Sequence, residues 1–180
     1  MKTGQNRSTK SIVVDVESDG PIPNMYSMVC FGAVVVEDPI RRTFYGETAP
    51  ISDIWDDDAL AVSGLSRKQH EAFPHPTKTM EEFKRWLDSL DADSFIFYSD
   101  NNGFDWQWIN YYFHMFTNHG NPFGWSSRRI GDIYCGMKGD VRARWKHLRI
   151  TKHTHNPVDD ARGNAEALLK MKEMGLKIKL

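Results

Sequence analysis

The sequence has little of several features that mark whole classes of protein. Only two cysteines occur in 180 residues, Cys30 and Cys135, too far apart for a disulfide framework or a metal-binding motif. No apolar run approaches the ~20 residues of a membrane-spanning helix, and the first ten residues lack the apolar core of a signal peptide. These absences predict a cytoplasmic protein that has no structural disulfides and no membrane association.

Excess charge of one sign is also missing. The chain has 23 lysines and arginines against 24 aspartates and glutamates, a formal net charge of −1. This balance excludes a strongly basic protein that binds nucleic acid mainly by neutralising phosphates. It leaves open an enzyme that holds nucleic acid through metal ions at an acidic centre.

The chain length and composition predict a single domain. Hydrophobic residues make up 40% of the sequence, which is ordinary for a globular protein, and no repeat or low-complexity segment divides it. We expect a flexible N-terminal segment at residues 1–10, a folded domain at 11–175 and a C-terminal tail at 176–180.

The order of predicted elements indicates a mixed α/β (α+β) sheet. β-branched runs predict three antiparallel strands, at residues 11–16, 28–37 and 42–47. Helical spacing follows over residues 80–90, where Thr79 and Glu82 suggest a capping box. The pattern continues with a strand at 95–99, a helix from about 105 to 117, a strand at 130–134 and a helix from residue 157. Three antiparallel strands followed by alternating helices and strands resemble a ribonuclease-H-like domain.

Two carboxylates stand at the end of the first predicted strand, in Asp15-Val16-Glu17. Side chains two residues apart on a strand point to the same face, so Asp15 and Glu17 lie together. Beside a glycine-containing turn, such a pair can hold a hard cation through oxygen ligands. A solvated strand end gives the same pattern, so the pair alone leaves both interpretations open.

Asp105 lies at a second junction, where the strand at 95–99 gives way to a helix. Such junctions are where α/β folds place ligands, and the helix dipole favours a carboxylate in the first turn. The alternative is that Asp100 or Asp105 only caps the helix.

A third junction contains His155 and two adjacent aspartates. Asn156 is a good N-cap and Pro157 a good first helical residue, so the last helix begins there. Helix geometry places Asp160 beside the apolar stripe of this helix and turns Asp159 toward solvent. Asp160 is therefore the better metal ligand. His155 lies on the preceding loop, and histidine is the residue type whose side chain can exchange a proton near neutral pH.

Taken together, the three segments resemble the motifs of one enzyme family. Their order and spacing over residues 12–169 resemble the DEDD superfamily of 3′-5′ exonucleases, in its DEDDh branch. The residues that carry the resemblance are Asp15, Glu17, Ser18, Gly20, Asn101, Phe104, Asp105, His155 and Asp160. The branch with a catalytic tyrosine carries it four residues before the last aspartate, where this chain has Asn156.

The resemblance implies a mechanism. Asp15, Glu17, Asp105 and Asp160 would bind two divalent cations, Mg²⁺ or Mn²⁺, and His155 would accept the proton of the attacking water. The products would be nucleoside 5′-monophosphates released from the 3′ end of single-stranded DNA or RNA. We expect the protein to act alone, as a homodimer or as a subunit of a larger complex.

Further residues are candidates for contact with the substrate. They are Ser18, Asp19, Gly20, Asn101, Phe104, Trp106, Arg144 and Lys146. The basic residues around Trp145, which also include Arg142, Arg149 and Lys152, can guide a nucleic-acid backbone, although a solvated helix face explains them equally well. The aromatic residues after Asp105 are better explained by core packing than by base stacking.

Two other functions remain open from the sequence. One is a non-catalytic module that binds nucleic acid on the same fold. The other is a phosphodiesterase or phosphatase that acts on small nucleotides. No motif in the sequence distinguishes DNA from RNA, because contact with the 2′-hydroxyl has no sequence signature.

Overall fold

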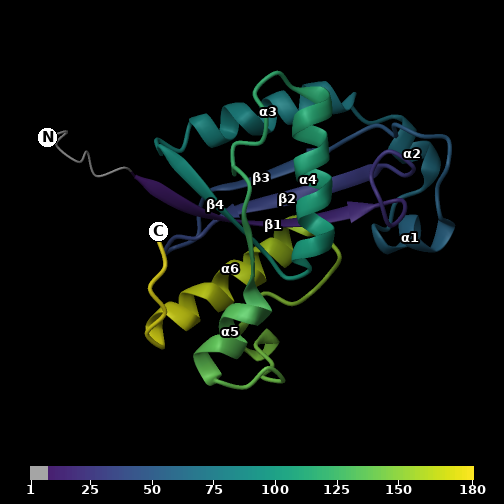
Figure 1. Ribbon diagram of the computed structural model, residues 1–180. Coiled ribbons are helices and arrows are strands. Elements are labelled where there is room, and N and C mark those ends of the chain that lie inside the picture. The colour runs from purple at the N-terminus through teal and green to yellow at the C-terminus, as the bar shows by residue number, and fades with distance from the viewer. Residues whose placement is uncertain (1–7) are drawn as a thin grey trace, which may run out of the picture.

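A mixed β-sheet with helices on both faces forms the body of the molecule (Figure 1). The computed structural model describes residues 8–180. Its strands are β1 (Thr9–Ser18), β2 (Met28–Val35), β3 (Thr43–Glu47), β4 (Ser94–Ser99) and β5 (Ser127–Arg129). Its helices are α1 (Asp57–Val62), α2 (Arg67–Glu71), α3 (Pro76–Asp88), α4 (Asn102–Phe116), α5 (Ile130–Lys138), the short 3₁₀ helix η1 (Lys146–Leu148) and α6 (Pro157–Glu173).

β1 occupies the centre of the sheet, whose strand order is β3-β2-β1-β4-β5. β1 pairs antiparallel with β2, and β2 pairs antiparallel with β3. On its other side β1 pairs parallel with β4, and β4 pairs parallel with β5. Parallel pairs need long crossover connections, which α3 and α4 supply here. This arrangement confirms the predicted mixed sheet that begins with three antiparallel strands.

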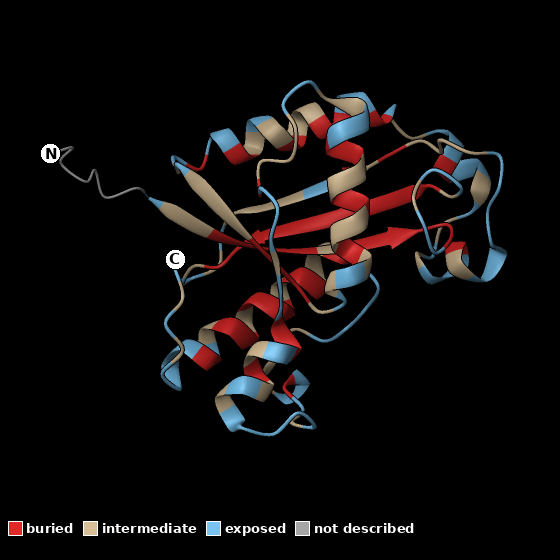
Figure 2. Ribbon diagram, viewed as in Figure 1, coloured by how far each residue is buried: buried red, intermediate tan, exposed pale blue. Residues whose placement is uncertain are grey.

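The two faces of the sheet are covered by different kinds of side chain. Alternate residues of β1 point to opposite faces, so Val14 packs toward α3 and α4, whereas Val13 packs toward α5 and α6. The α3 and α4 face is rich in buried aromatic residues, namely Phe31, Phe83, Phe97, Trp108, Tyr112 and Phe113. The α6 face is built from the small residues Ala161 and Ala165 with Leu168. Figure 2 shows the buried central strands between these layers.

One predicted strand is wrong. Residues 130–134 begin α5, and the strand lies just before them as β5. Ile130 and Tyr134 are four residues apart, so both lie on the buried face of that helix. Gly139 ends α5 in the left-handed conformation with φ of 64°, which glycine adopts without steric cost.

The capping box predicted at Thr79 and Glu82 is also wrong. α3 begins one turn earlier, at Pro76, and the His75 side chain accepts a hydrogen bond from the backbone N–H of Thr77. The Thr79 hydroxyl instead donates to the carbonyl of Glu47 on β3, which joins the helix to the sheet edge.

The ends of the chain differ from the expected division. β1 begins at Thr9, so residues 9 and 10 of the expected flexible segment belong to the sheet, and residues 1–7 lie outside the described residues. In the expected tail, Leu176 and Ile178 pack against the α6 side of the core. The Ser11 hydroxyl donates to the carbonyl of Lys179 at 2.6 Å, which fixes that segment beside β1. Among the described residues, no helix has the length and apolar character to cross a membrane.

Candidate active site

The end of β1 carries the first two acids of the site. Asp15 and Glu17 continue the face of β1 that Val13 begins, the same face that α6 covers. Glu17 is buried and Asp15 is partly exposed. The sequence prediction that the two carboxylates share one face therefore agrees with the register of β1.

α6 delivers the third acid by an unusually close approach to the sheet. Gly32 on β2 lies opposite Asp15, and a Cβ added to Gly32 would stand 2.4 Å from the backbone of Pro157 and of Val158. Only glycine lets the first turn of α6 rest on the strand in this way. The helix start at Pro157, with Asn156 as N-cap, is as predicted. As a result, one oxygen each of Asp15, Glu17 and Asp160 lies within 4.8 Å of the others.

Asp160 is held by several donors from the loop before α6. Its Oδ1 accepts from an Arg149 guanidinium N–H at 2.9 Å and from the Thr154 backbone N–H at 3.1 Å. Its Oδ2 accepts from the His155 backbone N–H at 3.0 Å and lies 2.7 Å from Nδ1 of His153. The side chain is 1% exposed. These bonds fix the orientation of the Asp160 carboxylate.

The guanidinium of Arg149 occupies a notch on α6. A Cβ added to Gly163 would lie 2.4 Å from Nε of Arg149 and 2.7 Å from the carbonyl oxygen of Thr151. The arginine lies just after η1 and outside any helix, and its side chain is only 8% exposed, so the alternative of a solvated helix face does not apply to it. Arg149 is a supporting residue for Asp160 rather than part of a substrate-guiding surface.

Asp105 joins the site from the first turn of α4. Its Oδ1 accepts a hydrogen bond from the backbone N–H of Val16, the residue between Asp15 and Glu17. Its Oδ2 is buried and has no hydrogen-bond partner among the described residues. The cap of α4 is Asn101, so the alternative that Asp100 or Asp105 serves as N-cap is wrong.

Burial and mutual repulsion raise the pKa values of these acids. Burial raises the pKa of Glu17 to about 7, and the nearby charge of Asp160 adds to the rise. The pKa of Asp15 is raised well above its usual value by burial and then by the charge of Asp105. Burial also raises the pKa of Asp105, against the hydrogen bond from the Val16 backbone N–H. Crowded carboxylates of this kind, one with an unpartnered buried oxygen, are a donor set that suits hard divalent cations.

His155 stands beside this cluster. Its Nδ1 lies 3.8 Å from Oε1 of Glu17, and half of its side chain is exposed. Its backbone is left-handed, with φ of 61°, and the hydrogen bond to Asp160 holds that conformation. The geometry puts an accessible imidazole next to the carboxylates, as a proton acceptor requires.

Three of the candidate substrate contacts lie in the turn after β1. The Ser18 hydroxyl donates to the carbonyl of Gly20 within this turn, and a Cβ on Gly20 would collide with the ring of Tyr26. The Asp19 carboxylate is fully buried, accepts from the Ser27 backbone N–H and pairs with Arg67 at 3.1 Å. Asp19 therefore supports the turn, and its carboxylate is not presented to a substrate.

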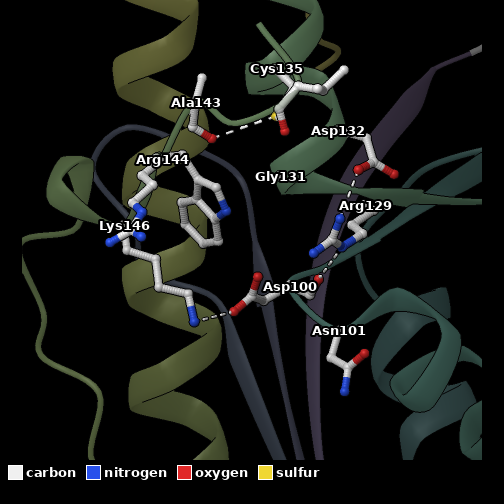
Figure 3. A pocket seen from close by; sticks show the side chains of 11 residues that line it. Asp100, Asn101, Arg129, Gly131, Asp132, Cys135, Ala143, Arg144 and Lys146 are labelled. Carbon is white, nitrogen blue, oxygen red and sulfur yellow. Dashed lines mark hydrogen bonds and ion pairs between the residues drawn. The ribbon is translucent and has the colours of Figure 1, made fainter.

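The remaining candidates lie around the start of α4 and the segment before η1. Phe104 and Trp106 are partly buried and pack edge-on against Trp108 and Phe97, which agrees with the core interpretation. Asn101 is exposed. It lines a pocket of about 670 Å³ together with Asp100, Arg129, Arg144 and Lys146 (Figure 3). Lys146 pairs with Asp100 at 2.7 Å, whereas Arg144 is exposed and forms no ion pair within the described chain.

No family model matches the chain. A curated protein, the 3′-5′ DNA exonuclease Cap18 of Escherichia coli, is 35% identical to it over 182 residues. The alignment covers 94% of this chain and 95% of that protein. The chain belongs to the 3′-5′ exonucleases. The exonuclease is thus an enzyme, and the alternative of a non-catalytic binding module is not supported.

Solved structures of low sequence identity share the fold of the exonuclease. Cell-death related nuclease 4 (CRN-4) superposes with a TM-score of 0.76 at 16% identity, covering 94% of this chain and 65% of that chain. The nuclease domain of 3′hExo, a DEDDh family member, gives a TM-score of 0.75 at 15% identity and covers 98% of this chain and all of that domain. E. coli exonuclease I, solved with a dA16 oligonucleotide, gives a TM-score of 0.67 at 17% identity. The match covers 93% of this chain and 41% of that chain. These matches confirm the ribonuclease-H-like fold, and the acidic cluster agrees with the use of divalent metal ions by DEDDh exonucleases.

Sequence reasoning missed three residues that shape the site. Gly32 carries no motif, and its role depends on a contact between β2 and α6 that only the fold reveals. Arg149 was included among basic residues for the substrate, but it bonds to Asp160 instead. His153 lies two residues before His155, and this His-x-His spacing is the signal that points to a second imidazole beside Asp160.

Proposed function

We propose that the exonuclease hydrolyses single-stranded DNA from its 3′ end and releases nucleoside 5′-monophosphates. The observation that carries this proposal is the crowding of buried carboxylates with raised pKa values at the end of β1, in a chain 35% identical to a DNA exonuclease. DNA is favoured over RNA because that relative is a DNA exonuclease. The proposed hydrolysis requires divalent cations, Mg²⁺ or Mn²⁺, and the family resemblance implies two of them.

Asp15, Glu17, Asp105 and Asp160 would hold the cations. Three of them already offer oxygens within 4.8 Å of one another, and Asp105 adds a buried oxygen without a partner. When bound, such cations polarise the phosphodiester and acidify a water molecule. Arg149 and the backbone of the loop before α6 keep Asp160 in place for this task.

His155 is the proposed general base. Its half-exposed imidazole lies beside Glu17, so it can receive the proton of a water that attacks the terminal phosphate. The left-handed backbone and the bond to Asp160 orient the residue toward the cluster.

Arg144 and Lys146 are the proposed contacts for the upstream backbone of the strand. They line the same pocket as Asn101, which caps the helix that carries Asp105. If a DNA strand leaves the acidic cluster along this pocket, its phosphates would contact the positively charged side chains of Arg144 and Lys146. Phe104 and Gly20 remain candidates for contact with the terminal nucleotide.

The decisive experiment follows the shortening of 5′-labelled oligonucleotides of matched sequence, as DNA and as RNA, single-stranded and double-stranded. We expect a ladder from the 3′ end of single-stranded DNA with Mg²⁺ or Mn²⁺, and no ladder in excess EDTA. A nitrophenyl ester of thymidine 5′-monophosphate tests the small-nucleotide alternative. The proposal would be contradicted if the ester were hydrolysed while the oligonucleotides stayed intact. Full activity in EDTA would also contradict it.

A further inference from the structure

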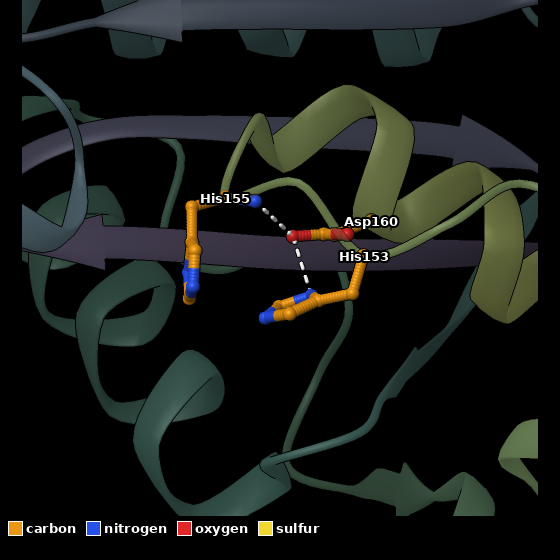
Figure 4. A group of neighbouring side chains, drawn as sticks. All are labelled: His153, His155 and Asp160. Carbon is orange, nitrogen blue, oxygen red and sulfur yellow. Dashed lines mark hydrogen bonds and ion pairs between the residues drawn. The ribbon is translucent and has the colours of Figure 1, made fainter.

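A second group of potential metal ligands lies beside the carboxylate cluster. It consists of His153, His155 and Asp160, and Figure 4 shows both imidazoles projecting to the same side of the Asp160 carboxylate. One ligand atom from each of the three residues lies within 4.8 Å of the others. The imidazole rings are themselves close, with centroids 4.3 Å apart and planes at 66°.

The loop that carries the two histidines is fixed to α6. Oε2 of Glu166 accepts hydrogen bonds from the backbone N–H groups of Ile150 and Thr151. Further along the loop, the backbone N–H groups of Thr154 and His155 donate to Asp160. The loop therefore presents both imidazoles in a preset arrangement, which lowers the entropic cost of binding an ion between them.

The exposure of the three side chains suits the capture of an ion from solvent. His153 is 54% exposed and His155 is 50% exposed, while Asp160 is 1% exposed behind them. An ion can reach the imidazoles directly and find the carboxylate already oriented by Arg149. The contact between His153 Nδ1 and Asp160 Oδ2, at 2.7 Å, shows that the imidazole already faces the carboxylate.

The donor set differs from that of the carboxylate cluster. Mg²⁺ prefers oxygen ligands, whereas two imidazoles with one carboxylate are a common ligand set for Zn²⁺, with a fourth position left open. We propose that His153, His155 and Asp160 form a binding site for Zn²⁺ that shares Asp160 with the carboxylate cluster. A bound Zn²⁺ would take the neutral imidazoles of His153 and His155 and the ionised carboxylate of Asp160 as its ligands.

Zinc at this site would inhibit the exonuclease. It would occupy the imidazole of His155, the proposed base, and compete for Asp160, a proposed ligand of the catalytic cations. This consequence rests on the proposed function, but the binding site itself does not.

Calorimetric titration of the whole chain with ZnCl₂ in a large excess of MgCl₂ tests the site directly. The wild type should bind one Zn²⁺. His153→Ala and His153→Gln should weaken its binding by at least the roughly 10–100-fold that loss of an outer-shell partner costs. His114→Ala is the matched control, because His114 is an exposed histidine on α4, and it should bind Zn²⁺ as the wild type does. Thermal melts establish that each variant is folded.

Three results would overturn the site: equal affinity in the wild type and in both His153 variants, loss of affinity in His114→Ala, or dependence on Asp15 without dependence on His153. The second readout is inhibition of Mg²⁺-supported nucleotide release, with each variant compared to its own zinc-free rate. His153→Ala should need more Zn²⁺ for half-inhibition than the wild type. If no release occurs at all, the proposed function fails, and the titration still decides the zinc site.

Discussion

Asp15 and Glu17 differ sharply from Asp19, although all three acids stand at alternate positions where β1 ends. The Asp19 carboxylate accepts from the Ser27 backbone N–H and pairs with Arg67, so its buried charge has partners. Burial still raises the pKa of Asp19, but these two partners oppose the rise. Asp15 and Glu17 have no comparable compensation, and neighbouring acids raise their pKa values further.

The difference distinguishes Asp19, which has a structural role, from the acids that are proposed to bind cations. A buried carboxylate with an amide and a guanidinium stabilises its turn, whereas crowded carboxylates without such partners need cations to stay ionised together. Favourable interactions elsewhere in the fold offset the repulsion between these carboxylates, as is common at functional sites. The following changes test whether the two groups behave in these opposite ways.

Asp15→Asn should have the largest effect on turnover. We expect a loss of about 10³-fold or more, because metal-assisted charge stabilisation contributes several kcal/mol and each ~1.4 kcal/mol is a factor of ten. In EDTA at neutral pH the variant should melt above the wild type, since one of the repelling carboxylates is gone. Rates of nucleotide release and melts in EDTA measure the two effects. If the variant were active and less stable than the wild type, Asp15 would have a structural role like that of Asp19.

Gly32→Ala should separate Asp160 from Asp15. The added methyl group would collide with the backbone of Pro157 and move the start of α6. A shift of about 1 Å in a catalytic constellation costs roughly 10²-fold in rate, which nucleotide release at saturating Mg²⁺ would detect. Gly136→Ala in α5 is the control, because nothing lies within 4 Å of its added Cβ. Equal rates in the two variants would contradict the close-approach interpretation.

Asp19→Asn should act on stability rather than on chemistry. The amide cannot balance the charge of Arg67, and such a loss costs about 1–3 kcal/mol. Urea unfolding should show this decrease in the free energy of unfolding. The Mg²⁺-dependent rate per folded molecule should stay close to that of the wild type. A selective loss of turnover, with stability unchanged, would instead make Asp19 part of the active site.

The acids without partners should make the metal-free protein less stable as the pH rises. Because the pKa of Glu17 is raised from 4.5 to about 7, the folded state binds more protons than the unfolded state between these values. The free energy of unfolding in EDTA therefore falls as the pH increases through this window. Melting curves against pH should show the slope, and Glu17→Gln should reduce it. A slope of opposite sign would mean that favourable partners stabilise the charge of Glu17, as they do for Asp19.

Asp159→Asn should have the smallest effect. The residue loses a favourable charge in the first turn of α6, which is worth ~0.3–1 kcal/mol, and turnover should stay near that of the wild type. Asp160→Asn, one residue later, should keep the fold and lose most of its activity. Paired melts and rates measure both variants. An inactive Asp159→Asn beside an active Asp160→Asn would show that the wrong aspartate has been assigned to the cluster.

Much of the site could be read from local sequence. The alternation of β1 placed Asp15 and Glu17 on one face, and Asn156-Pro157 fixed the start of α6, which in turn selected Asp160 over Asp159 as the buried acid. These inferences succeeded because strand and helix periodicity act within a few residues. The strand predicted at 130–134 failed because a short apolar run fits a buried strand and a buried helix equally well.

By itself, the sequence determined the order of most of the strands and of the long helices, the family motifs and the residue types that can hold cations. Only the tertiary structure decided which polar side chains face one another. It assigned Asp19 to Arg67, Arg149 to Asp160, and His153 to the edge of the carboxylate cluster. It also showed why Gly32 is a glycine, since β2 and the start of α6 are far apart in sequence and touch backbone to backbone. The physical reason is range: periodicity and capping are local, whereas charge compensation and close packing depend on neighbours that the fold brings from distant parts of the chain.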